Sequence, residues 1–424
     1  MRTYLDQIVQ ARVKGTPQGI TSVCSAHPVV LRAALRHAAA TGSVVLIEDT
    51  CNQVNHQGGY TGMRPADFVA LVEQIAREEC CPKDRILLGG DHLGPNPWRH
   101  LPAEVALVEA EAMVASYVAA GFRKIHLDAS MGCAGEPLAL DDAATAKRAV
   151  RLAAVAERVA KEQGGELPRY IIGTEVPPPG GADHALHDVP PTDPDAARKT
   201  IAVHRDCFGA AGLGDAFQRV IGVVVQPGVE FGNHNVVLYQ REKAQSLRHV
   251  LEDDQQFVFE AHSTDYQGTS PLSQLVRDGF AILKVGPELT FVLREALYAL
   301  DLNASDLVPG YGSRPLKAEM ERIMQDDPGQ WDRHYCGDAG ERSVLRHYSL
   351  SDRIRYYWVN DAAGRAVDRL IAALTGQSVP LPLFWQHWPA AAEFANTPLA
   401  PEDLLIWRVT QILASYHTAC NLKT

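Results

Sequence analysis

Residues 257–286 read FVFEAHSTDYQGTSPLSQLVRDGFAILKVG, and they contain one predicted strand–helix–strand unit. Two short apolar runs, at 257–262 and 281–286, are the expected strands. Between them, Ser270 before Pro271 is the expected start of a helix, because a hydroxyl can cap the first turn and proline fits its first position. A parallel strand pair joined by a crossover helix is the repeating unit of α/β folds.

The same alternation of apolar run and helical stretch recurs along the chain. Thr192-Asp193-Pro194 gives a second capped helix start between two predicted strands. The runs are nearly continuous in apolar residues, as expected for strands covered on both faces. Eight such units predict an α/β fold of the (β/α)₈ barrel type, and an open α/β sheet is the alternative. The predicted strands are residues 19–25, 43–49, 85–91, 124–128, 169–175, 219–226, 257–262 and 281–286.

The alternation fades after about residue 302, where helical segments are separated by proline-rich breaks such as SVPLPLF. We therefore predict two parts, a barrel at 1–302 and a C-terminal helical extension at 303–424 that packs on the barrel.

Composition limits the classes of partner. The 424 residues are 46% hydrophobic and carry a formal net charge of −11, with no Lys/Arg-rich run that would follow a nucleic-acid backbone. No window approaches the ~20 apolar residues of a membrane span, and the start lacks the apolar core of a secretory signal. Eight cysteines are scattered without a CxxC pair, which favours reduced thiols. A cytoplasmic protein that binds neither nucleic acid nor membranes is expected.

Each predicted strand ends in a polar cluster. In a (β/α)₈ barrel these ends converge on one face, which is the catalytic face. Eight converging clusters rich in His, Asp and Glu are hard to explain by solvation alone. They are Cys24-Ser25-Ala26-His27, Glu48-Asp49, Gly90-Asp91-His92, His126 to Ser130, Gly173-Thr174-Glu175, Gln226 to Glu230, Glu260 to Ser263 and Lys284-Val285-Gly286.

Three of these side chains could bind one divalent metal. His92, Glu230 and His262 end three different strands and offer imidazole and carboxylate ligands, with a position left for substrate. A hydrogen-bonding role is the alternative for each of them. For His126, bracing its neighbour is the preferred interpretation over ligation.

Carboxylates in the same set are candidates for proton transfer, namely Asp91, Glu175 and Asp128. Lys284 could bind a phosphate, orient a hydroxyl or pair with a carboxylate, whereas a Schiff base would need a neutral amine that this acidic environment disfavours. The candidates for substrate binding are His27, Glu48, Ser130, Gln226, Ser263, Lys284 and Arg353.

Cofactor motifs narrow the reaction. The sequence has no Gly-Lys dipeptide and therefore no P-loop, and no GxGxxG follows a strand at the start of a helix. It also lacks the GxSxG motif of α/β-hydrolases. Nucleotide cofactors consequently have no support in the sequence.

Long motifs spread over nearly the whole chain resemble the GatZ/KbaZ family, which is related to the tagatose-1,6-bisphosphate aldolase system of galactitol and N-acetylgalactosamine breakdown. These motifs are VCSAHP, NQVNHQGGYTGM, GGDHLGPNPW, GFRKIHLDASM, IGTEVPPPGGA, VVVQPGVEFGNHNV, FEAHSTDYQ, ILKVGPELTFVLREAL, SDRIRYYW and ASYHTAC.

The resemblance implies a site similar to that of metal-dependent class II aldolases. In those enzymes an Asp-His pair ends a strand, with the Asp as acid/base and the His as metal ligand, and here the pair is Asp91 and His92. A Glu before a Gly-Gly turn corresponds to Glu175, and a late strand-end His to His262. Where the aldolases have another ligating His, this chain offers Glu230, with His234 nearby, so the metal could be Zn, Mn, Co or Ni.

The family implies two kinds of function. Its members include D-tagatose 6-phosphate 4-epimerases and a non-catalytic partner of the aldolase subunit (GatY/KbaY-like), and some are labelled kinases, which the lack of an ATP motif disfavours. We expect a metal-dependent 4-epimerase that acts on a ketose or ketose phosphate by retro-aldol cleavage and re-addition. The sequence does not choose between the free and the phosphorylated sugar. The alternative is the partner subunit, and a homo-oligomer is a further expectation.

Overall fold

The chain folds into a closed barrel of eight parallel strands, as predicted, in a computed structural model that describes residues 3–173 and 188–422. The strand order around the barrel is β1-β10-β9-β6-β5-β4-β3-β2, so the open-sheet alternative is excluded. All eight predicted strands are present. Their bounds are β1 Ile20–Cys24, β2 Val45–Thr50, β3 Ile86–Leu93, β4 Lys124–Leu127, β5 Arg169–Ile172, β6 Val220–Val224, β9 Val258–Ala261 and β10 Phe280–Val285.

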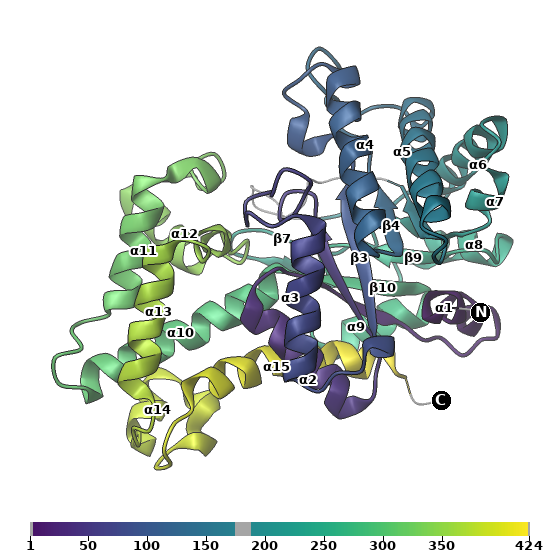
Figure 1. The fold of residues 1–424 in the computed structure, drawn as a ribbon. Coiled ribbons are helices and arrows are strands. Elements are labelled where there is room, and N and C mark those ends of the chain that lie inside the picture. Colours follow the sequence, from purple (N-terminus) through teal and green to yellow (C-terminus); the bar gives the residue numbers. More distant parts are fainter. Residues whose placement is uncertain (1–2, 174–187, 423–424) are drawn as a thin grey trace.

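Helices surround the barrel (Figure 1). Asp193 caps α6 through its side chain, as expected, whereas the prediction for Ser270 was wrong because α9 already begins at Thr269, after Gly268. The helices of this part are α1 Tyr4–Val13, α2 Pro28–Thr41, α3 Pro65–Glu78, α4 Ala103–Ala120, α5 Asp142–Glu162, α6 Pro194–Ala210, α7 Gly214–Phe217, α8 Gln245–Asp253 and α9 Thr269–Arg277, with 3₁₀ turns η1 Lys83–Arg85 and η2 Asn96–Trp98. A small antiparallel pair, β7 Glu230–Phe231 and β8 Val236–Val237, follows β6.

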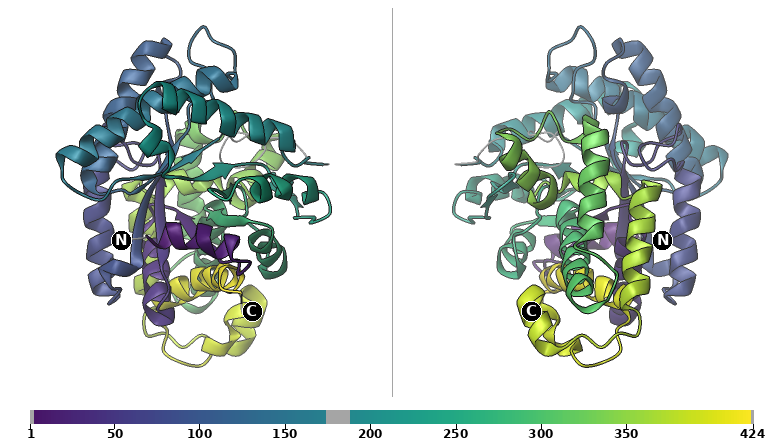
Figure 2. Two further views of the ribbon diagram at one scale, coloured as in Figure 1. Left: turned by 90° about the vertical axis from the view of Figure 1, so that its right-hand side faces the viewer. Right: turned by 90° about the vertical axis from the view of Figure 1, so that its left-hand side faces the viewer.

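The C-terminal segments are helical and extend to one side of the barrel (Figures 1 and 2). Residue 302, the predicted boundary, lies inside α10, and the division into two domains stays a prediction. The elements are α10 Pro287–Leu307, α11 Pro315–Asp326, α12 Ala339–Tyr348, α13 Asp361–Leu374, α14 Leu381–His387 and α15 Pro401–Cys420, with 3₁₀ turns η3 Pro328–Gln330, η4 Arg353–Tyr357 and η5 Pro389–Phe394.

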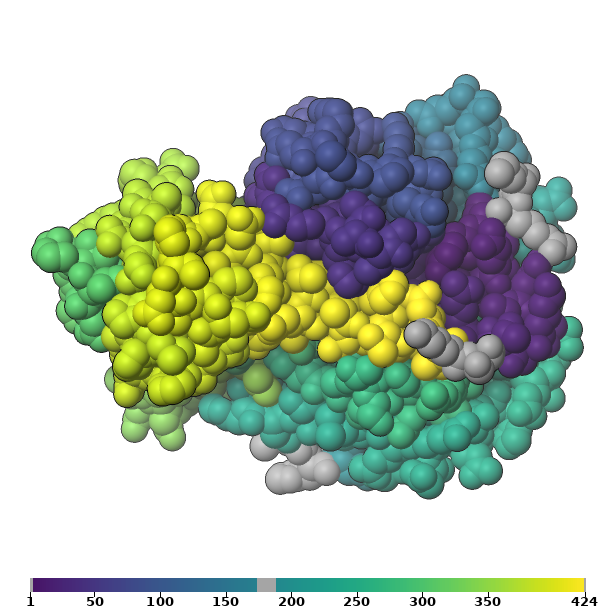
Figure 3. Space-filling model, turned by 90° about the horizontal axis from the view of Figure 1, so that it is seen from below, coloured from purple at the N-terminus to yellow at the C-terminus, as the bar shows by residue number. Residues whose placement is uncertain are grey.

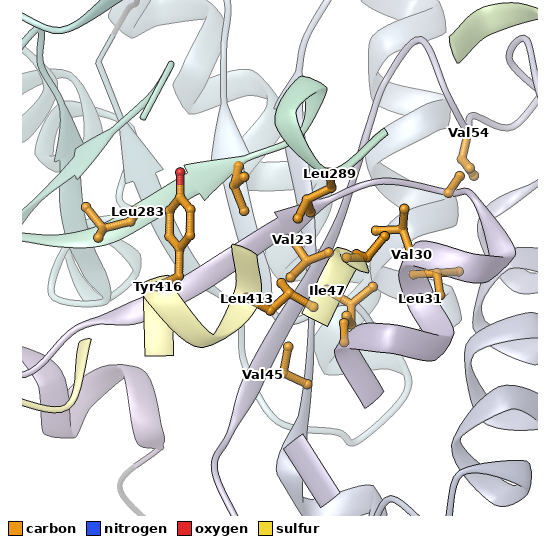
Figure 4. Close-up of a cluster of buried hydrophobic side chains, with 14 of the residues drawn as sticks. Val23, Val30, Leu31, Val45, Ile47, Val54, Leu283, Leu289, Leu413 and Tyr416 are labelled. Atoms are coloured by element: carbon orange, nitrogen blue, oxygen red, sulfur yellow. The ribbon is translucent and has the colours of Figure 1, made fainter. Parts of the chain in front are cut away.

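The last helix, α15, returns to the barrel and packs between α2 and α9 (Figure 3). Leu413 and Tyr416 of α15 lie against Val23 of β1 and Leu283 of β10, with Leu289 of α10 beside them (Figure 4). Burying such side chains contributes roughly 1.5–3 kcal/mol each, so the extension and the barrel share one core.

Inward-facing residues form two layers inside the barrel. Near the amino ends of the strands, Ile20, Ile171 and Ile282 form an apolar cluster with Leu5 and Ile8 of α1, which closes this end. The period of two along a strand brings the next inward positions into a charged layer. That layer contains Glu48, Lys124, Glu260 and Lys284, and the carboxyl ends of the strands lie above it.

Gly89 on β3 makes room for the charged layer. A Cβ atom at this position would lie 2.2 Å from Oε1 of Glu48, so any other residue would displace that carboxylate.

Among the described helices, none is long and apolar enough to cross a membrane.

Candidate active site

A cavity of about 460 Å³ opens at the carboxyl ends of the strands. Its wall includes Asp91, His92 and His262 from β3 and the end of β9, and Lys284 from β10. Residues of the extension also line it, namely Arg355, Tyr356 and Trp358. The volume is in the range of small-molecule sites.

Four buried side chains beside this cavity could hold one metal ion. Asp91, His92, His126 and His262 each offer a ligand atom, and these atoms all lie within 4.8 Å of one another. The three imidazole rings lie with their centroids 4.9–5.4 Å apart. Nitrogen and carboxylate donors in this number suit a divalent transition ion such as Zn²⁺.

His92 is oriented for ligation by Asp128. Its Nδ1 lies 2.8 Å from Oδ2 of Asp128, which leaves Nε2 directed at the cluster. Burial alone would raise the pKa of Asp128, but the hydrogen bond and charge of His92 hold this pKa below its usual range. A carboxylate that fixes the tautomer of a ligating histidine is a common support for metal sites.

Within residues 3–173 and 188–422, one buried nitrogen of His126 has no hydrogen-bond partner. Its Nδ1 lies 3.0 Å from Oδ1 of Asp91 and 3.3 Å from the backbone nitrogen of His92. Its Nε2 is buried and makes no hydrogen bond to any described residue. Burial lowers the pKa of His126, which favours the neutral form that ligates. This orphaned atom fits a metal ligand.

In the charged layer beneath the cluster, two lysines hold the neighbouring carboxylates in place. Nζ of Lys124 lies 2.7 Å from Glu48 and 2.6 Å from Glu260. Nζ of Lys284 lies 3.1 Å from Glu48 and contacts Asp91. Of the roles considered for Lys284, the structure therefore contains the pairing with carboxylates.

These pairings set the charge states. Burial acts against the charge of Lys284, yet the carboxylates of Asp91, Glu48 and Glu260 raise its pKa well above the usual value, so a Schiff-base role is disfavoured. Burial would also raise the pKa of Asp91, but His92 and Lys284 keep it well below its usual range. Asp91 is therefore a carboxylate.

Backbone strain accompanies the cluster. His92 and Ser263 have φ values of 51° and 52°, in the left-handed region that residues other than glycine seldom adopt. Both residues line the cavity at the ends of β3 and β9. Strain of this kind gathers at functional sites, where surrounding contacts hold it.

The predicted site residues fall into groups. Asp91, His92 and His262 lie in the cluster, and the cavity wall also includes His27, Ser263 and Lys284. Glu48 lies in the charged layer and Asp128 supports His92, while Glu175 is outside the described residues. The others do not line the cavity, and their predicted roles stay predictions. Ser130 donates to Asp128, Gln226 accepts from the backbone of Gly228, Glu230 accepts from Phe231, and Arg353 donates to Gln330.

Sequence reasoning gave too little weight to two groups. His126 and Lys124 share the inward face of KIHLD, where the period of two could have indicated both. Arg355 and its aromatic neighbours reach the cavity from η4, and no local pattern indicates which of its residues face a distant barrel.

Two sequence comparisons cover nearly the whole chain. The family model for D-tagatose-1,6-bisphosphate aldolase subunit GatZ/KbaZ-like proteins matches residues 5–421. A D-tagatose 6-phosphate 4-epimerase from Agrobacterium fabrum is 59% identical over 419 residues, which cover 99% of each chain.

Solved structures extend the comparison. A crystal structure of a probable tagatose 6 phosphate kinase from Sinorhizobium meliloti 1021 superposes with a TM-score of 0.87 and 50% identity, covering 95% of this chain and 100% of that one. The YdjI aldolase from Escherichia coli K12 gives a TM-score of only 0.44 at 14% identity, over 86% of this chain and 100% of that one. The family match spans the barrel, the cluster and the extension alike, and the chain belongs to the GatZ/KbaZ-like family.

Proposed function

We propose that this protein is a D-tagatose 6-phosphate 4-epimerase that forms D-fructose 6-phosphate. The observation that carries the proposal is the buried cluster of Asp91, His92, His126 and His262 beside a cavity of sugar-binding size. The activity named for the relative from Agrobacterium fabrum, which is 59% identical over 99% of its length, supplies the substrate.

Epimerisation at C4 requires a bond at that carbon to break and form again. In a retro-aldol path, a base takes the proton of the C4 hydroxyl, the C3–C4 bond breaks, and its electron pair enters the C2 carbonyl to give an enediolate. The C4 aldehyde then turns its other face to C3, the bond re-forms, and the proton returns to the C4 oxygen. No electron acceptor is needed, since the first and last states have the same oxidation level.

Residues of the cluster suit these tasks. The imidazoles of His92, His126 and His262 would hold a divalent ion, which would supply a Lewis acid for the ketose oxygens, and Asp91 beside them would stay available as a base. Asp91 is a carboxylate at the cavity wall and is a candidate base for the C4 hydroxyl, together with Glu175 as predicted from the sequence. Lys284 keeps Asp91 charged through their contact.

The family description also names an aldolase subunit, so a non-catalytic partner role is the second candidate. A purely structural partner has no need of a strained, buried set of acids and imidazoles at a cavity. We therefore rank this role second. Cytoplasmic location and homo-oligomerisation stay predictions.

Incubation of the purified protein alone with D-tagatose 6-phosphate tests the proposal. With Zn²⁺, Mn²⁺, Co²⁺ or Ni²⁺ added in turn, we expect D-fructose 6-phosphate to form and to be seen by carbon NMR. Because the reaction needs no second subunit, an aldolase partner should not be required. Failure with every metal, followed by activity only in an aldolase assay with the partner subunit, would favour the second candidate.

A further inference from the structure

Arg355 brings a cationic group from the extension to the cavity. It belongs to η4 and lines the cavity with Tyr356 and Trp358, above the strand ends that carry the cluster. Its guanidinium carbon lies 4.4 Å from the ring centroid of Tyr356. The side chain is therefore packed against a ring in the wall of the site.

Hydrogen bonds fix the guanidinium and still leave part of it available. Nη1 donates to the backbone oxygens of Ser351 and Asp352, and Nη2 donates to the hydroxyl of Tyr356 at 2.8 Å. No described residue accepts from Nε. Nε lies on the side of the guanidinium fork that suits an oxygen of an anion.

The charge of Asp352 acts on Arg355, but without a direct contact between the two side-chain charges. Among the described residues, none forms an ion pair with Arg355 within 4.0 Å. Asp352 accepts instead from Arg294 at 2.9 Å and from Thr290 at 2.7 Å. The carboxylate of Asp265, also in the cavity wall, accepts from the backbone nitrogens of Gly286 and Glu288 at the start of α10.

The pKa of Asp265 reflects the same separation. Burial raises it to about 6, and the backbone hydrogen bonds from Glu288 and Gly286, followed by the charge of Arg355, oppose this rise. Arg355 and Asp265 therefore influence each other's charge, but among the described residues no carboxylate contacts the guanidinium directly, and an anionic ligand could do so.

We infer that Arg355 binds the phosphate of the substrate and selects phosphorylated over free ketose. The inference rests on the proposed function: the carbons that react lie at the cluster, and the phosphate at C6 is at the other end of the sugar. Arg353 is a weaker candidate, because it is buried outside the cavity wall and donates to Gln330. The extension would then contribute a specificity residue to the barrel.

The test compares Arg355→Gln and Arg355→Lys with the wild type on D-tagatose 6-phosphate and on D-tagatose. We expect Arg355→Gln to lower kcat/KM for the phosphorylated sugar by roughly 10- to 150-fold, the range of a charge-assisted contact, with a much smaller loss on the free sugar. Arg355→Lys should recover part of the loss. Arg369→Gln is the control, since Arg369 belongs to the same extension but bonds to the backbone of Tyr311 outside the cavity.

A fold defect would lower kcat/KM for both sugars together, so the ratio of the two values isolates the phosphate contact. Equal losses on both, or none, would overturn the inference. A calorimetric measurement of D-tagatose 6-phosphate binding tests the role of Arg355 independently of the proposed function. If the wild type is inactive yet binds the sugar phosphate, weaker binding by Arg355→Gln supports the inference and equal binding contradicts it.

Discussion

Replacing His92 or His126 by alanine is expected to remove bound divalent metal and to lower kcat/KM for D-tagatose 6-phosphate by roughly 10³-fold or more. A Lewis acid contributes several kcal/mol to the stabilisation of developing charge, and each ~1.4 kcal/mol is a factor of ten in rate. Metal content by mass spectrometry and turnover on the same samples measure both effects.

Two further variants grade this prediction. Asp128→Asn keeps both histidines but removes the charge that orients His92, so metal affinity should fall by roughly 10- to 100-fold with the site still formed. His249→Ala removes an exposed histidine that pairs with Glu252 on α8, and it should leave metal content and rate unchanged. Full metal content and full turnover in both His92→Ala and His126→Ala would refute the assignment.

Lys124→Met is expected to destabilise the fold by about 3–5 kcal/mol, which is typical when one partner of a buried charge pair is removed. Methionine fills a similar volume, but Glu48 and Glu260 would lose a cation at 2.7 and 2.6 Å in a fully buried layer. Lys83→Met is the matched control, because Lys83 forms an exposed pair with Glu73, and it should change stability by no more than about 1 kcal/mol. Urea unfolding measures both.

The difference in stability between the wild type and Lys124→Met should depend on pH in a definite direction. Burial alone would raise the pKa of Glu260, but Lys124 and Lys284 hold it well below the usual value. The stabilisation from Glu260 is thus present above its unfolded pKa and is lost as pH falls toward its folded pKa. Without Lys124 the carboxylate binds a proton more readily, so the gap between variant and wild type should narrow on acidification. A Lys124→Met protein as stable as the wild type at neutral pH would contradict the account.

The local sequence pattern predicted the barrel well, because every strand is a short apolar run whose two faces are both buried. The start of α9 was misplaced since Gly268, with φ of 75°, forms the N-terminal cap that Ser270 was expected to provide. The position of α15 between α2 and α9 could not be predicted, since apolar periodicity identifies a buried face but not the elements that cover it.

The candidate site likewise contains residues that the sequence indicates and residues that only the packing reveals. The sequence predicted Asp91, His92 and His262 on one face because polar residues at strand ends must meet there in a barrel, and the structure does bring these three side chains together. His126 was assigned to bracing, and its unpartnered Nε2 is visible only once the packing is known. The choice between Arg353 and Arg355 depends on which side of one short 3₁₀ turn faces the cavity, which the sequence does not indicate.

The central claim, C4 epimerisation through cleavage of the C3–C4 bond, is tested most directly by running the reaction in D₂O. The retro-aldol path never breaks the C4–H bond. The D-fructose 6-phosphate formed from D-tagatose 6-phosphate in D₂O should therefore contain no deuterium at C4, which NMR measures. Deuterium at C4 would show removal and return of that hydrogen instead, and it would contradict the account.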